Sequence, residues 1–380
     1  MRPRWDPYFL ASGGESSQFW RDYLAEGDSD VLIICGSGFD PRTPLGAQEI
    51  LHAGGGGKRD CLLLDYDEGD NSPSTEYEEL ASANADLLAK EVANRGTVDK
   101  RTVRMWSGSG PGKRRISSRS AADIIPDLGY LMQYDSVIVD VSAMPRGVFF
   151  PLIGKSLTLL DSANEPRQPG LPSLCVIVSE NPHLDSKIRD VGPDDSASYV
   201  HGFGSDLGMQ STAHVPKILI PVLGESQAEQ LRRIYDLVNP DEVCPVVPSP
   251  SKGPRRGDDL LLEYRSILFD EWSVEHRNLL YVSEQNPFEV YRQILRTADH
   301  YNRALHALGG CQVAITAVSS KLLSLGAMLA AYDLKRNKFH TGLAHVEVQG
   351  YVMDTPSIDE TLLEKTELHT IALFGDFYDE

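Results

Sequence analysis

One stretch of the sequence occurs twice, and this repeat constrains the fold more than any other feature. Residues 137–153, VIVDVSAMPRGVFFPLI, align without a gap to residues 314–330, AITAVSSKLLSLGAMLA. Each copy has a β-branched run, a tight turn that contains serine, and an apolar helical segment, with Ser142 matching Ser319. A strand–turn–helix unit presents backbone N–H groups at the helix start, where anions bind. We therefore expect a pseudo-symmetric protein with a ligand between its halves.

Short apolar runs alternate with helical patterns along the whole chain, which is typical of a parallel α/β sheet with crossover helices. Each half has five predicted strands in comparable order. The predicted strands are 31–35, 61–66, 103–106, 137–141, 174–178, then 218–223, 243–247, 279–282, 313–317 and 344–348. The predicted helices lie near 16–25, 76–94, 119–132, 146–161, 226–237, 258–270, 287–307 and 320–334. The expected fold class is α/β, with two Rossmann-like parallel-sheet domains in tandem.

These patterns also predict where the domains begin and end. The segment between the two halves is rich in Gly, Ser, Asp and Pro, as linkers are. We expect a helical extension over 1–29, a first Rossmann-like domain over 30–180, a linker over 181–215, a second domain over 216–355 and a tail over 356–380.

Composition is that of an ordinary globular protein, with 41% hydrophobic and 24% charged residues among 380. No apolar run approaches the roughly 20 residues of a membrane helix, and the first residues lack the apolar core of a signal peptide. The five scattered cysteines form no CxxC pair and indicate small core residues in a reducing cytoplasm. The histidine spacing predicts no metal site, and no pattern calls for a cofactor.

A net charge of −19 argues against general affinity for nucleic acid. Basic residues nevertheless cluster at 113–115, KRR, and at 252–256, KGPRR. Two confined basic loops on an acidic protein would suit a small phosphorylated ligand. The alternative is that both are solvated loops beside turns.

The turn at residues 319–321 of the second copy is the clearest pointer to a binding site. The apolar helix that follows is explained completely by core packing, which explains Ser319, Ser320 and Lys321 less well. A lysine at a helix start opposes the helix macrodipole unless an anion offsets it. At the matched turn of the first copy, SAMPR at 142–146, Arg146 suits an anion equally, or is simply exposed to solvent.

The loop after the first predicted strand reads GSGFDPRTPLG, residues 36–46. Its glycines permit a close approach of the backbone to a phosphate, and its arginine would supply a bidentate contact. It is neither the GxGxxG of dinucleotide binding nor a P-loop. The candidate ligand contacts here are Gly36, Ser37, Gly38 and Arg42, and the alternative is a purely structural turn.

The loop at 248–257 follows the second strand of the second half, on the side of the sheet where parallel-sheet ligands bind. Its Lys252, Arg255 and Arg256 form the strongest positive cluster on any predicted strand end. Ligand contact and a solvated loop both remain open for it.

The sequence contains no convincing catalytic constellation. There is no GxSxG elbow and no cysteine at an electropositive helix start. Glu180 and Glu284 each follow a predicted strand and would serve as acid or base groups, or as parts of ordinary turns. Whether the chain is an enzyme therefore stays open.

The segment AVSSKLLSLGAMLAA, residues 317–331, resembles the ligand-binding motif of CARF domains, Rossmann-like sensors of prokaryotic antiviral systems. Two CARF-like units in one chain resemble the SAVED arrangement, which binds cyclic oligonucleotides. The resemblance covers roughly residues 30–180 and 216–350, and Ser319–Ser320 replace the glycines usual in the family. It implies contacts from Ser319, Ser320 and Lys321, with Ser142 and Arg146 at the matched turn.

Together these features predict a nucleotide- or cyclic-oligonucleotide-binding sensor or adaptor subunit of a prokaryotic antiviral defence system. Its partners would be a small phosphorylated ligand and a separate effector protein, with no membrane involved. One alternative is an enzyme acting on a nucleotide or phosphorylated metabolite, with Asp40, Arg42 and Glu180 or Glu284 in catalysis. The other is a scaffold subunit without a ligand.

Overall fold

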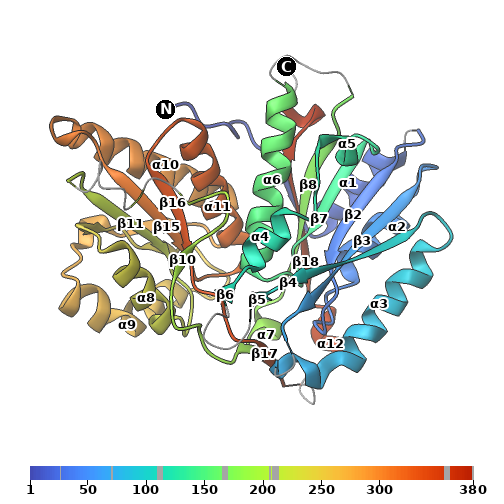
Figure 1. Ribbon diagram of the computed structural model, residues 1–380, viewed down its shortest axis with the longest axis horizontal. Coiled ribbons are helices and arrows are strands. Elements are labelled where there is room, and N and C mark those ends of the chain that lie inside the picture. Colours follow the sequence, from blue (N-terminus) through green and yellow to red (C-terminus); the bar gives the residue numbers. More distant parts are fainter. Residues whose placement is uncertain are drawn as a thin grey trace. The chain divides into compact units, whose positions relative to one another are not determined.

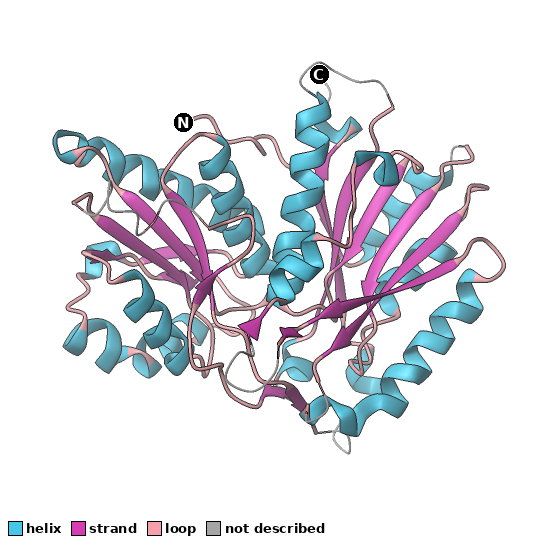
Figure 2. Cartoon of the chain, viewed as in Figure 1, coloured by secondary structure: helices cyan, strands magenta, loops and turns pink. Residues whose placement is uncertain are grey.

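The computed structural model describes residues 1–25, 27–69, 72–108, 114–164, 170–204, 207, 214–354 and 360–378. The chain divides into two compact units: unit 1 comprises Met1–Asp6 and Pro193–Glu347, and unit 2 comprises Pro7–Gly192 and Val348–Glu380. Each unit contains a twisted sheet with helices on both faces (Figures 1 and 2).

Unit 2 is built on a seven-stranded sheet with the order β1-β18-β8-β7-β2-β3-β4. Its strands are β1 (Leu10–Ser12), β2 (Val31–Gly36), β3 (Arg59–Asp67), β4 (Val98–Arg104), β7 (Ser136–Asp140), β8 (Ser173–Glu180) and β18 (Glu367–Phe374). The five strands from β8 to β4 are parallel, whereas β18 and β1 are antiparallel to their neighbours. Two short antiparallel pairs complete the unit: β5 (Trp106–Ser107) with β6 (Arg114–Arg115), and β9 (Ile188–Asp190) with β17 (Tyr351–Met353).

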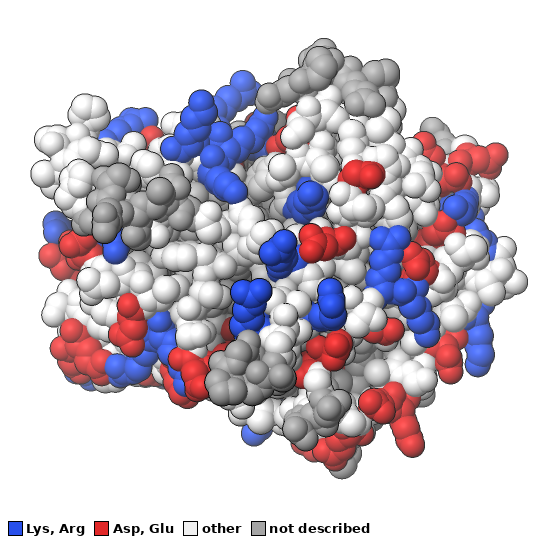
Figure 3. Space-filling view, viewed as in Figure 1, with Lys and Arg blue, Asp and Glu red and all other residues white. Residues whose placement is uncertain are grey.

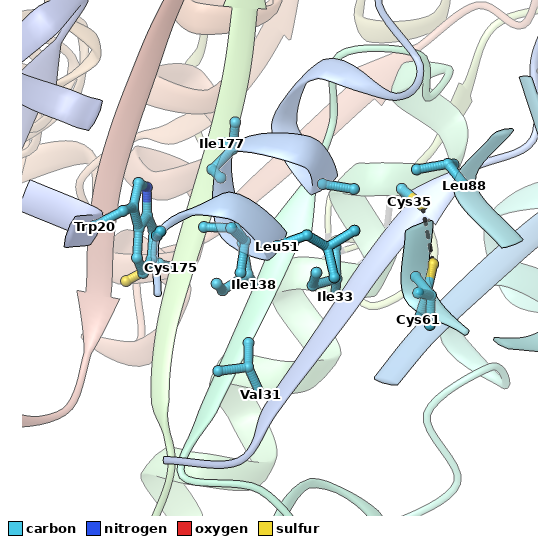
Figure 4. Close-up of a cluster of buried hydrophobic side chains, with 14 of the residues drawn as sticks. Trp20, Val31, Ile33, Cys35, Leu51, Cys61, Leu88, Ile138, Cys175 and Ile177 are labelled. Carbon is cyan, nitrogen blue, oxygen red and sulfur yellow. Dashed lines mark hydrogen bonds between the residues drawn. The ribbon is translucent and has the colours of Figure 1, made fainter. Parts of the chain in front are cut away.

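The helices of unit 2 are α1 (Gly14–Ala25), α2 (Leu45–His52), α3 (Glu78–Val92), α4 (Ser117–Ala122), α5 (Leu128–Leu131), α6 (Arg146–Asn164), α7 (Pro182–Asp185) and α12 (Glu360–Leu363). Helices α1, α2 and α3 cover one face of the sheet, where alternate strand residues form a hydrophobic core (Figure 4). Cys35 and Cys61 lie side by side in this core with their sulfur atoms 3.5 Å apart. All five cysteines are buried, as expected for small core residues.

Unit 1 has a sheet with the order β10-β16-β15-β11-β13-β14, and β12 also pairs with β11. Its strands are β10 (Ser198–Tyr199), β11 (Lys217–Val222), β12 (Glu242–Val243), β13 (Val246–Pro248), β14 (Leu280–Val282), β15 (Gln312–Ala317) and β16 (Thr341–His345). Its helices are α8 (Ala228–Val238), α9 (Arg256–Glu263), α10 (Pro287–Ala304) and α11 (Lys321–Arg336). Helices α8 and α9 pack on one face, and α10 and α11 pack together and against the strands of the sheet.

The two sheets share one topology. When the parallel strands of each unit are counted in chain order, both sheets have the arrangement 3-2-1-4-5, with an antiparallel strand added beside strand 5. The two copies of the sequence repeat supply strand 4 of each sheet, β7 and β15, and the helix that follows it. The predicted class, two Rossmann-like parallel-sheet domains related by duplication, is confirmed.

Most predicted strands lie within a few residues of the observed ones, and the differences have local causes. The strand expected at 103–106 is β4 at 98–104, and the one expected at 344–348 is β16 at 341–345. The helix expected at 119–132 is interrupted between α4 and α5, where Pro126 lacks the N–H that a continuous helix needs. The strand expected at 243–247 is divided into β12 and β13, with Pro245 between them.

The division of the chain also differs from the expected segments. The chain passes from one unit to the other three times, after Asp6, Gly192 and Glu347. The segment expected as a tail, 356–380, supplies β18, which pairs with β8 along seven residue positions. The segment expected as a linker, 181–215, supplies β9 and β10, one to each unit.

Candidate functional site

The strand order places one ligand-binding edge in each unit. In a 3-2-1-4-5 sheet the chain leaves strands 1 and 4 in opposite directions, which opens a crevice at their carboxyl ends. We call the ends of β2 and β7 the first switch point and the ends of β11 and β15 the second switch point. Both serine turns of the repeat lie at these positions.

At the second switch point the loops after strands 1 and 4 are in direct contact. A Cβ built on Gly224 would stand 2.2 Å from the carbonyl oxygen of Val318 and 2.7 Å from the Cα of Ser319. The opposite side of this loop is fixed by Tyr264, whose hydroxyl donates to the carbonyl oxygen of Gly224 at 2.7 Å. The absence of a side chain at residue 224 is therefore a condition for bringing the two turns together.

Helix α11 begins directly at this point. Ser320 is its N-cap, with Oγ accepting from the N–H of Leu323 at 3.3 Å, and Lys321 is its first residue. Ser319 is buried, whereas Ser320 and Lys321 are partly exposed. The next thirteen residues, from Leu322 to Leu334, are all buried, so the helix is held rigidly on the sheet. Its positive N-terminal dipole and the lysine ammonium act at the same place, which suits an anion.

Arg256, the first residue of α9, links the ends of strands 1, 2 and 3 in unit 1. Its guanidinium contacts both carboxylate oxygens of Glu225, from Nε at 2.5 Å and from Nη2 at 2.8 Å, and its Nη1 contacts Glu284. We call Glu225, Arg256 and Glu284 the carboxylate–arginine cluster. Burial acts to raise the pKa of Glu225, but its hydrogen bonds and ion pair with Arg256 outweigh burial and hold the pKa below its usual value.

The other two predicted basic residues of this loop differ from Arg256. Lys252 donates its backbone N–H to Glu284 Oε2 at 2.7 Å, and its side chain is exposed. Arg255 is the N-cap residue of α9, makes no side-chain cap, and is exposed. Lys252 and Arg255 thus lie in the loop just before α9, while Arg256 stays within the carboxylate–arginine cluster.

At the first switch point most of the residues predicted to contact a ligand instead contact other residues of the protein. Ser37 donates its N–H to the carbonyl of Leu64 at 2.7 Å, and Gly38 accepts from Thr43 and Asn84. Gly36 lies under the hydroxyl of Tyr66, which a Cβ at residue 36 would meet at 2.2 Å.

The serine of the first repeat copy is also used internally. Ser142 is fully buried, and its Oγ accepts from the N–H of Ser179 at 2.8 Å, joining the ends of β7 and β8. The helix after this turn begins at Arg146, two positions later than α11 begins in the aligned frame. The two turns therefore match in sequence but present different groups.

The side chain of Arg42 binds groups of its own unit. Its side chain is almost completely buried and binds Asp40 through Nε at 3.0 Å and Nη2 at 2.7 Å. Nη1 binds Asp185 at 2.7 Å and the carbonyl oxygen of Ser179 at 3.3 Å. Burial acts to lower the pKa of Arg42, but Asp40 and Asp185 raise it above its usual value. Two carboxylates and a carbonyl oxygen therefore occupy the guanidinium of Arg42, which the sequence predicts to bind a phosphate.

Arg146 lies among acidic groups of the same unit. Burial lowers the pKa of its guanidinium, while Tyr351, Asp190 and Asp185 act in the opposite direction. These neighbours come from β17, β9 and α7. An incoming anion would compete with them for Arg146.

Sequence reasoning missed two residues that shape the second switch point. Tyr264 holds Gly224, and it also receives the N–H of Gln227 at 3.2 Å. Its position in an apolar helical pattern looks like ordinary core. Glu225 gives no local signal in the sequence, because its partner Arg256 is 31 residues away.

Two broader properties concern the described part of the chain. It contains no group of three or more His, Cys, Asp and Glu side chains placed to hold a metal ion. Among the described residues, no helix combines the length and the apolar character that crossing a bilayer requires.

Comparison with known proteins finds only weak structural similarity. No protein-family model matches the chain, and no curated protein matches it by sequence. Among solved structures, it is similar to a Type III CRISPR defence DNA nuclease activated by cyclic oligoadenylate, with 11% identity and a TM-score of 0.44 over 88% of this chain and 70% of the nuclease. It is also similar to a protein described as a universal stress protein from Pseudomonas aeruginosa, with 12% identity and a TM-score of 0.22 over 85% of this chain and 94% of that one.

Proposed function

We propose that this chain binds a nucleotide or cyclic oligonucleotide at the second switch point and acts as a sensor or adaptor subunit of a prokaryotic antiviral defence system. A separate effector protein would respond to the bound state. The observation that carries the proposal is the position of Lys321, at the first residue of a buried 16-residue helix and at the carboxyl end of strand 4.

Charge and shape at this position favour a phosphate. A cation at a helix N-terminus is unfavourable by about 0.3–1 kcal/mol when alone, and a bound anion reverses the sign of that interaction. Ser320 adds a hydroxyl beside the lysine, and Gly224 keeps the loop after strand 1 free of a side chain at its contact with Ser319. An anionic group would fit such a site better than a neutral one.

The two switch points are expected to contribute unequally. Arg42 and Ser142 at the first switch point are bound to groups of their own unit. Both of these residues are buried, whereas Ser320 and Lys321 at the second switch point are partly exposed. We therefore assign the phosphate contacts mainly to unit 1, with Ser319, Ser320 and Lys321 as the contact residues and Lys252 and Arg255 as further cations of the same unit.

Binding is favoured over the alternative of catalysis by the state of the acidic side chains. Asp40 is held by Arg42, and Glu284 is held by Arg256 and by the N–H of Lys252. Carboxylates whose oxygens are occupied in this way are poorly placed to accept a proton from a substrate.

The test is binding of a panel of cyclic dinucleotides, cyclic oligoadenylates and linear nucleotides, followed by calorimetry and thermal shift. At least one compound should raise the melting temperature, and Lys321→Gln should weaken its binding at least tenfold. Arg277→Gln removes one exposed cation from the same unit, where Arg277 pairs with Glu275, and should leave binding unchanged.

Each alternative function has its own outcome in this experiment. Consumption of the bound compound by the purified protein would make the chain an enzyme. If no compound shifts the melting temperature, the scaffold alternative replaces the sensor. Equal binding by the Lys321→Gln variant would move the ligand site away from the second switch point.

A further inference from the structure

A basic region lies on unit 2 of this acidic protein. Residues 98–123 contain seven Lys or Arg and two Asp, although the whole chain has a net charge of −19. Figure 3 shows Lys and Arg side chains gathered in the middle of the view, over the region of α4 and β4 to β6 in Figure 1. We call the six described cations of this region the basic strip: Lys100, Arg101, Arg104, Arg114, Arg115 and Arg119.

Backbone contacts place these residues on one continuous surface. β4 is the edge strand of its sheet, and the N–H of Arg104 donates to Ser120 Oγ, beside Arg119, at 2.9 Å. The N–H of Ile116 donates to the carbonyl of Met105 at 3.0 Å. Residues 106 and 107 then pair with 115 and 114 in the short hairpin. Strand β4, the hairpin and α4 therefore carry adjacent parts of the strip.

Four of the six cations lack a counter-ion. Within the described residues, the side chains of Lys100, Arg104, Arg114 and Arg119 form no ion pair or hydrogen bond, and all four residues are exposed. Elsewhere, some exposed arginines of this protein have carboxylate partners, as Arg232 has in Glu271, whereas Arg265 and Arg296 have none among the described residues. What distinguishes the strip is that four such cations lie close together, where they repel one another and an acidic partner would remove the repulsion.

The other two cations are fixed by the fold. Arg101 pairs with Asp99 at 2.8 Å and stacks on Tyr130, with its guanidinium carbon 4.7 Å from the ring centre. Arg115 lies 3.8 Å from the centre of the Trp106 ring and donates to the carbonyl oxygen of Val348 at 2.6 Å. They hold the surface in shape, and the four unpaired cations remain for a partner.

The spacing and the charge balance favour a short acidic segment of a protein over nucleic acid. Lys100 and Arg104 lie on the same side of β4 and about 13 Å apart, which an extended peptide of about five residues spans. A long polyanion would extend beyond the strip, whose attraction reaches only about one Debye length, about 8 Å at physiological salt, and would lie against the acidic remainder of the protein. Each of the rings of Trp106 and Tyr130 already has an arginine against it, which leaves a poor platform for base stacking.

We propose that the basic strip is a docking surface for an Asp- or Glu-rich segment of a partner protein. The unpaired cations bind its carboxylates, and the stacked arginines keep the surface preformed. This site lies in unit 2, whereas the ligand site proposed above lies in unit 1, so each can fail without the other.

A labelled peptide of twelve glutamates provides the probe, with fluorescence anisotropy on the full chain as the readout. Binding is expected at low salt and should weaken at least tenfold when the salt concentration is raised from about 50 to about 300 mM. The variant Arg104→Ala/Arg114→Ala/Arg119→Ala should weaken binding at least fivefold. The control variant Arg21→Ala/Arg277→Ala/Arg303→Ala removes the same charge from exposed positions outside the strip and should bind as the unsubstituted chain does.

Two results would overturn the proposal. One is unchanged peptide binding by the triple variant of the strip. The other is tighter binding of a 30-base-pair duplex than of the peptide, lost in the same variant, which would make the strip a nucleic-acid interface. The variant with lysine at residues 104, 114 and 119 keeps the charge and should retain binding, and the alanine variant should keep the melting temperature of the unsubstituted chain, so that its loss of binding reports the loss of charge.

Discussion

Replacing Gly224 by alanine tests the geometry of the second switch point most directly. The added Cβ would meet only backbone atoms, with the carbonyl oxygen of Val318 at 2.2 Å, the Cα of Ser319 at 2.7 Å and the carbonyl carbon of Val318 at 3.0 Å. Carbon atoms in good contact lie about 3.5–4.0 Å apart, so the two loops must separate by about 1 Å. The site and the stability of unit 1 should both suffer.

The size of the effect follows from overpacking a well-packed region, which typically costs about 1–3 kcal/mol. Gly224 is expected at the upper end, about 3 kcal/mol, because none of the three atoms belongs to a side chain that could rotate away. For a unit of this size, about 1 kcal/mol lowers the melting temperature by roughly 2–4 °C. The unit 1 transition should therefore fall by about 6–12 °C in a calorimetric scan.

Gly38 supplies the matched control from the loop after strand 1 of the other sheet. A Cβ there would have its nearest neighbours at 3.7 Å, which is ordinary contact, so Gly38→Ala should change the melting temperature by less than about 2 °C. If Gly224→Ala melts like Gly38→Ala and binds the same ligands, the close contact between the loops is not a requirement of the site.

Three further substitutions test other parts of the framework. Asp60→Ala removes a buried carboxylate that accepts from the N–H and hydroxyl of Thr97 and from Tyr134, and should cost about 3 kcal/mol in urea unfolding. Burial acts to raise the pKa of Asp60, but these bonds and Lys58 lower it below its usual value. The stability that Asp60 contributes should therefore be present at neutral pH and be lost below about pH 4. The Asp60→Ala variant should not show this loss. Arg42→Met leaves Asp40 buried without its cation and should cost about 3–5 kcal/mol, which unfolding of unit 2 would reveal. Ser320→Ala removes the N-cap of α11 and should cost about 1 kcal/mol by the same measurement, and an unchanged midpoint in any of the three would contradict the assigned contact.

The parts of the fold that the sequence predicted are those written in local patterns. The strands β2, β7 and β15 are continuous buried runs, and the helices after them show apolar residues at helical spacing. Strands β18 and β10 were missed, because their pairing partners β8 and β16 lie far away in the sequence. A two-residue strand such as β10 has no pattern of its own and exists only through that pairing.

The candidate site likewise has residues whose placement follows from local sequence and residues whose environment depends on distant segments. The placement of Ser319, Ser320 and Lys321 at a strand end and a helix start follows from their immediate neighbours. The environment of Arg42 depends on Asp185, which is 143 residues away in the chain. The sequence shows Asp40 two residues before Arg42, but neither the burial of this pair nor the second carboxylate that a distant segment brings to it, so a buried ion pair was interpreted as an anion site.

The antiparallel strands explain why the domain boundaries could not be found from the duplication. In each half the chain continues past strand 5 into one strand of the β9–β17 pair and then into an antiparallel strand. That last strand joins the sheet of the other half: β10 from the first half pairs with β16, and β18 from the second half pairs with β8. The halves have thus exchanged equivalent strands, and the backbone edge of each strand 5 is covered by a segment encoded in the other copy. The duplication seen in the sequence marks two equal halves of the chain, but each folded unit contains segments from both halves.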